Sequence, residues 1–189
     1  GNQTPCSGNG YMGLYTAYPM CDPYREYIQA PLSSPLTIGL TYYVCFYVSL
    51  GDAYNYASNR IGAYFSTTPV ANGGNNPCNG IPNGNLSYIP QVESTVIITD
   101  KVGWTLVSGS FVAAAAYTYI TIGNFRNGAG TTVQLVPNGV GIAPAFHIDA
   151  AYYFIDNVCV STGGACSAPP CAGALPVELF SFSGECLSE

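Results

Sequence analysis

Apolar and polar residues alternate along several short runs that are rich in tyrosine, valine, isoleucine, threonine and phenylalanine. Such alternation places apolar side chains on one face of a β-strand that lies between a core and solvent. Six Asn-Gly dipeptides separate the runs, and this pair favours positive φ and marks turns. The pattern predicts eight strands, at residues 25–30, 41–50, 60–66, 94–99, 103–112, 117–125, 131–136 and 151–160.

The alternation also predicts which side chains face the core. In the longest run the even-numbered residues form one apolar face, Tyr42, Val44, Phe46 and Val48. Ala113–Ala116 is the one candidate for a helix, and it is too short to be stable alone. Many short strands with turn signals predict an all-β protein, an antiparallel β-sandwich or jelly roll.

The C-terminal part of the chain differs from the rest. Residues 163–174 are rich in Gly, Ala, Pro and Cys and predict a linker, so we divide the chain into a sandwich domain, 1–162, and a tail, 175–189. Residues 175–183 predict one extra strand with apolar side chains on both faces. The first face holds Val177 and Leu179, and the second holds Phe180 and Phe182. A strand of this kind needs to be covered on both sides.

Charged residues are scarce, at 7% of the chain against roughly 25% in a typical soluble domain. Four Lys and Arg face ten Asp and Glu, which gives a net charge of −6. This balance excludes binding to the backbone of nucleic acids, which needs clustered cations. The sequence contains no apolar run long enough for a membrane span and no signal peptide, so we expect Gly1 to be a processed end or the start of the ordered region.

The chain has an even number of cysteines, Cys6, Cys21, Cys45, Cys78, Cys159, Cys166, Cys171 and Cys186. This number predicts an oxidising compartment and up to four disulfides, whose connectivity stays open. Three local pairings are plausible, Cys166 with Cys171, Cys6 with Cys21, and Cys45 with Cys159. Metal binding by these thiols is disfavoured, because no Cys-x-x-Cys occurs and His147 is the single histidine.

The sequence does not predict an enzyme. The carboxylates are scattered rather than paired, His147 has no clear Ser or Cys partner, and there is no phosphate-binding loop. Exposed aromatic rings can bind sugars, because a sugar ring presents an apolar face to a flat side chain. The candidates for such a platform are Trp104, Tyr43, Tyr47 and Tyr64. For Trp104 we also expect the alternative of a core residue or an interface anchor.

Six motifs occur in order along the chain: Tyr24–Gln29, Gly39–Val44, Ile61–Ser66, Ile98–Trp104, Tyr119–Phe125 and Tyr153–Val158. Together they resemble a jelly-roll module of secreted surface proteins of Bacteroidota, similar in layout to carbohydrate-binding modules, over about residues 10–160. The segment Leu175–Phe180 resembles the one that precedes a type IX secretion sorting region in such proteins. The resemblance implies an extracellular or cell-surface location.

Two departures from this family bear on function. The family begins with a strand that the sequence does not show before Tyr11, and Cys45 and Cys159 stand where the family more often has a small polar residue. Similar jelly rolls hold a structural Ca²⁺ with an Asp of the final strand, and Asp156 matches that position. Ca²⁺ needs six to eight oxygen ligands, and the other ligands are not identified. Apart from this ion we expect no cofactor.

Assembly explains three features at once. Few charges guard the sheet edges against pairing, the first strand of the jelly roll is expected to be missing, and a spare strand follows a linker. We therefore expect a non-enzymatic structural subunit of a filament or surface layer, whose partners are copies of itself joined by donation of residues 175–183. The alternative is a monomeric glycan-binding or adhesin module in which residues 175–183 complete their own sandwich.

Overall fold

The computed structural model describes residues 3–22, 24–71, 85–139, 148–164 and 175–176. One sheet contains, in spatial order, β1 (Met12–Ala17), β10 (Ala151–Ser161), β3 (Thr41–Leu50) and β7 (Thr105–Val112), with β11 (Leu175–Pro176) also paired to β10. A second sheet contains β2 (Tyr27–Pro31), β8 (Tyr119–Asn124), β5 (Ile61–Ser66) and β6 (Val92–Glu93). The remaining elements are the strand pair β4 (Tyr56–Ser58) and β9 (Val133–Leu135), and a 3-10 turn, Gly128–Gly130.

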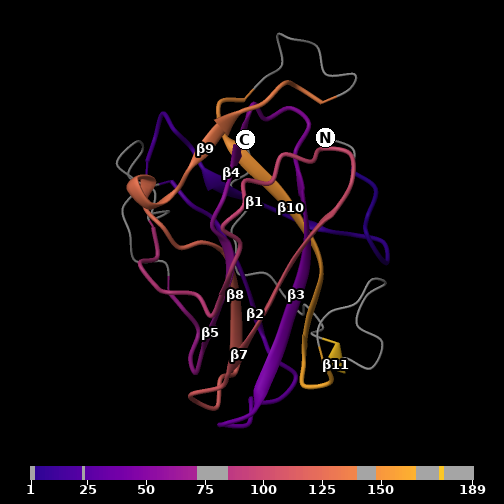
Figure 1. Cartoon of the computed structure of the whole chain (residues 1–189), viewed down its shortest axis with the longest axis vertical. Coiled ribbons are helices and arrows are strands. Elements are labelled where there is room, and N and C mark those ends of the chain that lie inside the picture. The colour runs from indigo at the N-terminus through magenta and orange to yellow at the C-terminus, as the bar shows by residue number, and fades with distance from the viewer. Residues whose placement is uncertain (1–2, 23, 72–84, 140–147, 165–174, 177–189) are drawn as a thin grey trace.

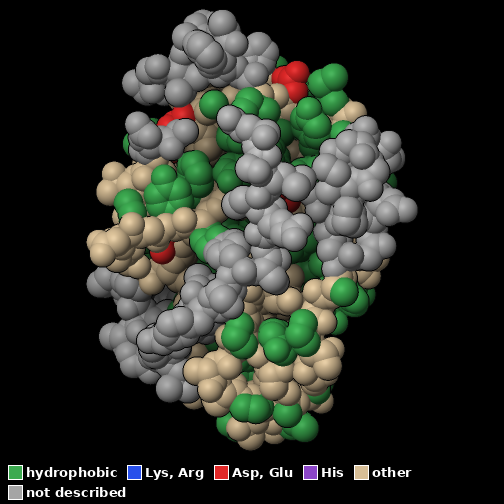
Figure 2. Space-filling view, turned by 180° about the vertical axis from the view of Figure 1, so that it is seen from behind, with side chains coloured by type: hydrophobic (Ala, Val, Ile, Leu, Met, Phe, Trp, Pro, Cys, Tyr) green, Lys and Arg blue, Asp and Glu red, His purple; other side chains and the backbone are tan. Residues whose placement is uncertain are grey.

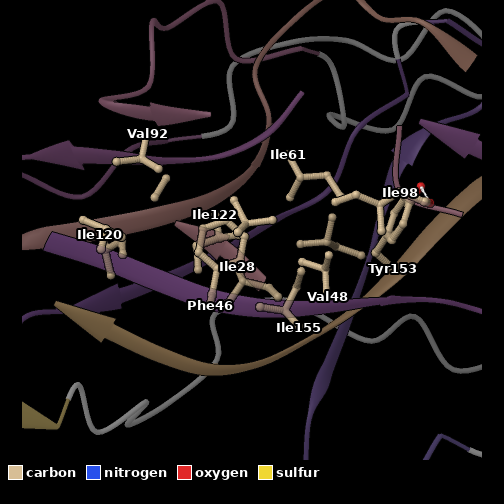
Figure 3. Close-up of a cluster of buried hydrophobic side chains, with 14 of the residues drawn as sticks. Ile28, Phe46, Val48, Ile61, Val92, Ile98, Ile120, Ile122, Tyr153 and Ile155 are labelled. Atoms are coloured by element: carbon tan, nitrogen blue, oxygen red, sulfur yellow. Dashed lines mark hydrogen bonds between the residues drawn. The ribbon is translucent and has the colours of Figure 1, made fainter. Parts of the chain in front are cut away.

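The two larger sheets pack on a shared core, and all their strand pairs are antiparallel (Figure 1). Phe46 and Val48 of β3 and Ile122 of β8 all belong to this core (Figure 3). The predicted inward face of β3 is confirmed, since Tyr42, Val44, Phe46 and Val48 are all buried. The molecule is thus an all-β, sandwich-like protein, as the alternation predicts.

Most predicted strands match the structure, with boundaries shifted by at most two residues. The strand predicted at 94–99 is wrong, because pairing ends at Glu93 and the chain then crosses the end of the sandwich. Ile98 on this crossing is buried, and its carbonyl accepts a hydrogen bond from the hydroxyl of Tyr153. The apolar residues of the segment therefore cover the core without forming a ladder.

The structure has no strand among residues 3–11, but it forms an edge strand directly after them that the sequence pattern does not predict. Met12–Ala17 pairs with Ala151–Ile155 and forms an edge of the first sheet. A glycine in the middle weakens the strand signal of this short segment. The glycine is needed there, because the ring of Tyr152 occupies the position that a Cβ of Gly13 would take.

Cys6 has a free thiol, so the predicted disulfide between Cys6 and Cys21 is wrong. Strand β1 runs between them, and its 6 residues span about 20 Å at a rise of ~3.3 Å per residue. Cys45 and Cys159 stand opposite each other on β3 and β10, as predicted. Among the described residues, Cys21, Cys45 and Cys159 do not have free thiols. The other predicted disulfide positions lie outside the described residues, Cys78, Cys166, Cys171 and Cys186.

Within the described residues, no helix has the length and apolar character that crossing a membrane requires.

Candidate functional site

The edge of β10 that faces away from β3 consists of two halves. Over the first half, Ala151–Ile155, β10 pairs with β1. Beyond Ile155, β1 has ended, and Cys159 and Val160 pair instead with Pro176 and Leu175 of β11. Because β3 occupies the other side of β10 along both halves, β11 lies on the same side as β1. The long strand β10 therefore offers a second half-edge to an added strand.

A β-bulge separates the two halves. Asn157 has a φ of 56°, and the register with β3 shifts between Asp156 and Cys159. The extra residue reverses the alternation: Tyr153 and Ile155 face the core before the bulge, and Val160 faces it after the bulge. At the bulge the pairing with β1 ends. Beyond it, the side chains of β10 change faces and the strand pairs with β11.

Asp156 lies at this bulge and is buried. Its carboxylate accepts hydrogen bonds from the backbone N–H of Asn157 at 2.6 Å and of Ser7 at 3.0 Å. Asp156 was the predicted Ca²⁺ ligand, and among the described residues no group of three or more His, Cys, Asp or Glu surrounds a common point. In the structure the carboxylate holds the N-terminal segment against β10.

The N-terminal segment, residues 3–10, crosses the outer face of the first sheet. Gln3 Nε2 donates to Ser49 Oγ at 2.5 Å, and the indole N–H of Trp104 donates to the carbonyl of Thr4 at 2.9 Å. The Trp104 ring also meets Tyr11 edge to face, with 5.8 Å between the ring centroids. Trp104 therefore anchors this segment to the sheet, and it is not one of the buried core residues.

The other platform candidates do not form one surface. Tyr43 and Tyr47 lie half-buried on the outer face of β3, whereas Tyr64 belongs to β5 in the second sheet. Tyr64 stacks instead on Tyr88, with 4.6 Å between the centroids and 18° between the ring planes. Tyr88 is 40% exposed and lies in a segment without regular pairing, so strand patterns gave no signal for it.

The stacked pair forms one wall of an open cavity of about 330 Å³, which Gln91 and Tyr117 also line. Burial, followed by the nearby hydroxyls of Tyr88 and Tyr117, raises the pKa of Tyr64 above the ordinary value for tyrosine. Flat neutral rings beside amide and hydroxyl groups match an uncharged ligand such as a sugar. This cavity is the second candidate site, and the edge of β10 beyond Ile155 is the first.

Two partly buried carboxylates of the described residues are engaged in structural contacts. Glu93 binds Arg126 through Nε at 2.8 Å and Arg60 through Nη1 at 2.9 Å. Glu26 accepts the N–H of Tyr15, and burial raises the pKa of Glu26. His147 lies outside the described residues.

Charge is unevenly distributed over the molecule. The segments 27–51 and 105–125 contain no charged residue, and neither does the part of β10 that follows Asp156. These segments converge at the end of the sandwich where Thr41 pairs with Val112 and Ser161 pairs with Tyr43. In Figure 2 the acidic side chains lie over the upper part of the molecule, and the lower end shows apolar and uncharged atoms. The half of β10 that follows Ile155 thus lies at the uncharged end.

The apolar side chains predicted to make the tail a donor strand lie outside the described residues: Val177, Leu179, Phe180 and Phe182. The described part of the tail is Leu175–Pro176. Pro176 opposes Cys159 and has no N–H to donate, so it can sit only at an edge or at the start of a strand. The position of β11 therefore identifies where the tail meets the sheet.

No protein-family model matches this chain, and searches among curated proteins and among solved structures return no match.

Proposed function

We propose that this chain is a non-enzymatic structural subunit, exported to the cell surface or beyond, that assembles by adding its tail to the half of β10 beyond Ile155 in a neighbouring copy. The observation that supports it is the pairing of Leu175 and Pro176 with β10 at the point where β1 has ended. Strand addition uses this kind of edge, because backbone hydrogen bonds give affinity and side-chain pockets give register.

The described pairing of β11 is made within one chain, and the same contacts can be made between chains. An element that exchanges between identical copies keeps its contacts, so the exchange costs little free energy. Burying the four apolar side chains of the donor strand contributes about 6–12 kcal/mol before entropy, at roughly 1.5–3 kcal/mol each. A head-to-tail contact that does not close produces a filament.

The arrangement of strands supports a jelly roll as the scaffold. Successive strands of the chain alternate between the sheets as β1, β2, β3 and β5, and the two sheets have the orders β1-β10-β3-β7 and β2-β8-β5-β6. We assign the jelly-roll topology on these orders. In this scaffold the last long strand, β10, lies between the first strand and the third, so its C-terminal half becomes an edge wherever the first strand is short.

Deletion of residues 175–189 tests the proposal by electron microscopy of the purified chain. We expect the full chain to form filaments and the shortened chain to remain dispersed. A matched pair of single changes separates the donor strand from the extreme terminus: Leu179→Lys should abolish filaments, and Glu189→Lys should leave them intact. Filaments formed by the shortened chain contradict strand donation.

A peptide that spans residues 175–183 tests the exchange between chains. The shortened chain should bind the labelled peptide, and the full chain should bind it more weakly because its own tail competes for β10. A peptide with Leu179 and Phe182 replaced by lysine is the control. Equal binding of both peptides contradicts a specific site for the tail.

A second candidate function is glycan binding, and the stacked pair Tyr64 and Tyr88 favours it. A glycan array with the Tyr88→Ala variant tests this function, because Tyr88 is accessible and Tyr64 keeps its place in β5. Tyr43→Ala is the matched control on the other sheet. Trp104→Ala is a poor probe, because it releases the N-terminal segment. Glycan binding that survives Tyr88→Ala excludes this cavity as the binding site.

A further inference from the structure

The other edge of the first sheet is formed by β7, beside β3 (Figure 1). All 8 residues of β7 pair with β3 in one unbroken register, from Thr41 opposite Val112 to Val48 opposite Thr105. Among the described residues, the backbone of β7 makes no hydrogen bond outside this ladder. Every second N–H and C=O of β7 therefore points away from the sheet.

The strand itself has none of three common protections against pairing. Its sequence, Thr-Leu-Val-Ser-Gly-Ser-Phe-Val, contains no charge and no proline, and its register contains no bulge. Natural proteins use these three features to prevent two sheet edges from joining. Ser108, Ser110 and Val112 are exposed on the outer face, and Val112 is 59% exposed. A small, flat and uncharged outer face permits close approach of another strand.

The sequence of β7 is self-complementary about Gly109. When two antiparallel copies are centred on this residue, Ser108 of one copy faces Ser110 of the other. The same register places Leu106 opposite Val112 on the outer face, and Val107 opposite Phe111 on the inner face. Opposite residues of an antiparallel pair share one face of the sheet, so apolar side chains meet apolar ones at both ends of the contact.

Gly109 has an independent reason to be glycine. A Cβ at this position would lie 2.9 Å from Cγ1 of Val92 in β6, so the packing between the sheets requires its absence. In two antiparallel copies centred on Gly109, two residues without a side chain then lie opposite each other. The centre of the self-complementary sequence is therefore the position of β7 with the least side-chain bulk.

We propose that β7 pairs antiparallel with β7 of a second copy of this chain across a twofold axis at Gly109, which joins the two first sheets into one continuous sheet. A contact of this kind is isologous and closes as a dimer. It uses the opposite edge of the sheet from the tail site on β10, and it does not rest on the proposed strand donation.

Two charged variants test both the contact and its register in the full chain by sedimentation velocity. In Ser108→Lys with Ser110→Lys, lysine faces lysine across the axis, and we expect the dissociation constant of the dimer to rise at least tenfold. In Ser108→Lys with Ser110→Glu, lysine faces glutamate of the other copy, and we expect the dimer to persist and to weaken with salt. Both changes are at exposed positions, and far-UV circular dichroism checks that both variants keep the fold.

The tail variant Leu179→Lys separates this inference from strand donation. We expect it to abolish filaments and to leave the β7 dimer intact. A wild-type chain that is monomeric at every concentration overturns the β7 contact, and so do equal dissociation constants for the two charged variants. A dimer that is lost in Leu179→Lys but retained in the double lysine variant shows that the tail, rather than β7, joins the copies.

Discussion

Replacing Tyr153 with phenylalanine removes one hydroxyl from the middle of the sandwich and leaves the ring in place. Tyr153 is fully buried in β10. Its hydroxyl donates to the carbonyl of Ile98 at 2.6 Å and accepts the backbone N–H of Ser58 at 2.8 Å. One side chain thus ties β10 to β4 and to the segment that crosses the end of the core.

The cost of this replacement follows from the two groups that it leaves without a partner. A buried donor or acceptor that loses its hydrogen bond costs about 1–3 kcal/mol, so two of them cost about 2–6 kcal/mol. The ring keeps its apolar contacts, so the loss of packing is small in comparison. A change of this size is a large part of the ~5–15 kcal/mol that stabilises a typical domain.

Urea unfolding, followed by the fluorescence of the single tryptophan, measures the free energy of unfolding of the wild type and the variant. Tyr43→Phe is the control, because Tyr43 lies half-buried on the outer face of β3. The control should change the free energy of unfolding by less than about 0.5 kcal/mol. A loss below about 1 kcal/mol in Tyr153→Phe refutes the reasoning, because one of the two groups must then find another partner.

Three further predictions concern packing, charge and pH. Gly62→Ala should destabilise the fold by about 1–3 kcal/mol, because its Cβ would lie 2.6 Å from the carbonyl oxygen of Val92, whereas Gly10→Ala, in open space, should have little effect by thermal unfolding. Glu93→Gln should cost about 1 kcal/mol, since it weakens the ion pairs with two arginines that are each about one-third exposed, and high salt should reduce the difference from wild type in urea unfolding. Burial raises the pKa of Tyr27 from 10.0 to about 12, so the stability that neutral Tyr27 provides is complete below pH 10 and is lost as the pH rises towards 12. Circular dichroism should show alkaline unfolding in that range together with phenolate absorbance; phenolate formation at Tyr27 near pH 10 in the folded state contradicts its burial.

The candidate site was only partly accessible to sequence reasoning. A spare strand at the C-terminus could be predicted from the apolar residues on both of its faces. The partner of that strand could not, because the second half of β10 becomes an edge only when β1 ends at its first half. Tyr88 gave no strand signal, and its role appears only where the chain brings it onto Tyr64.

The alternation of apolar residues by itself determined the all-β class, the positions of most strands and the inward face of β3. Each of these depends on a local property of the segment, namely which alternate side chains are apolar and leave water on folding. Tertiary structure alone decided that Met12–Ala17 is a strand, that Trp104 holds the N-terminal segment, and that Cys6 is not joined to Cys21. These outcomes depend on which segments lie next to each other in the folded chain. That arrangement is set by the packing of the whole core and not by the sequence of any one segment.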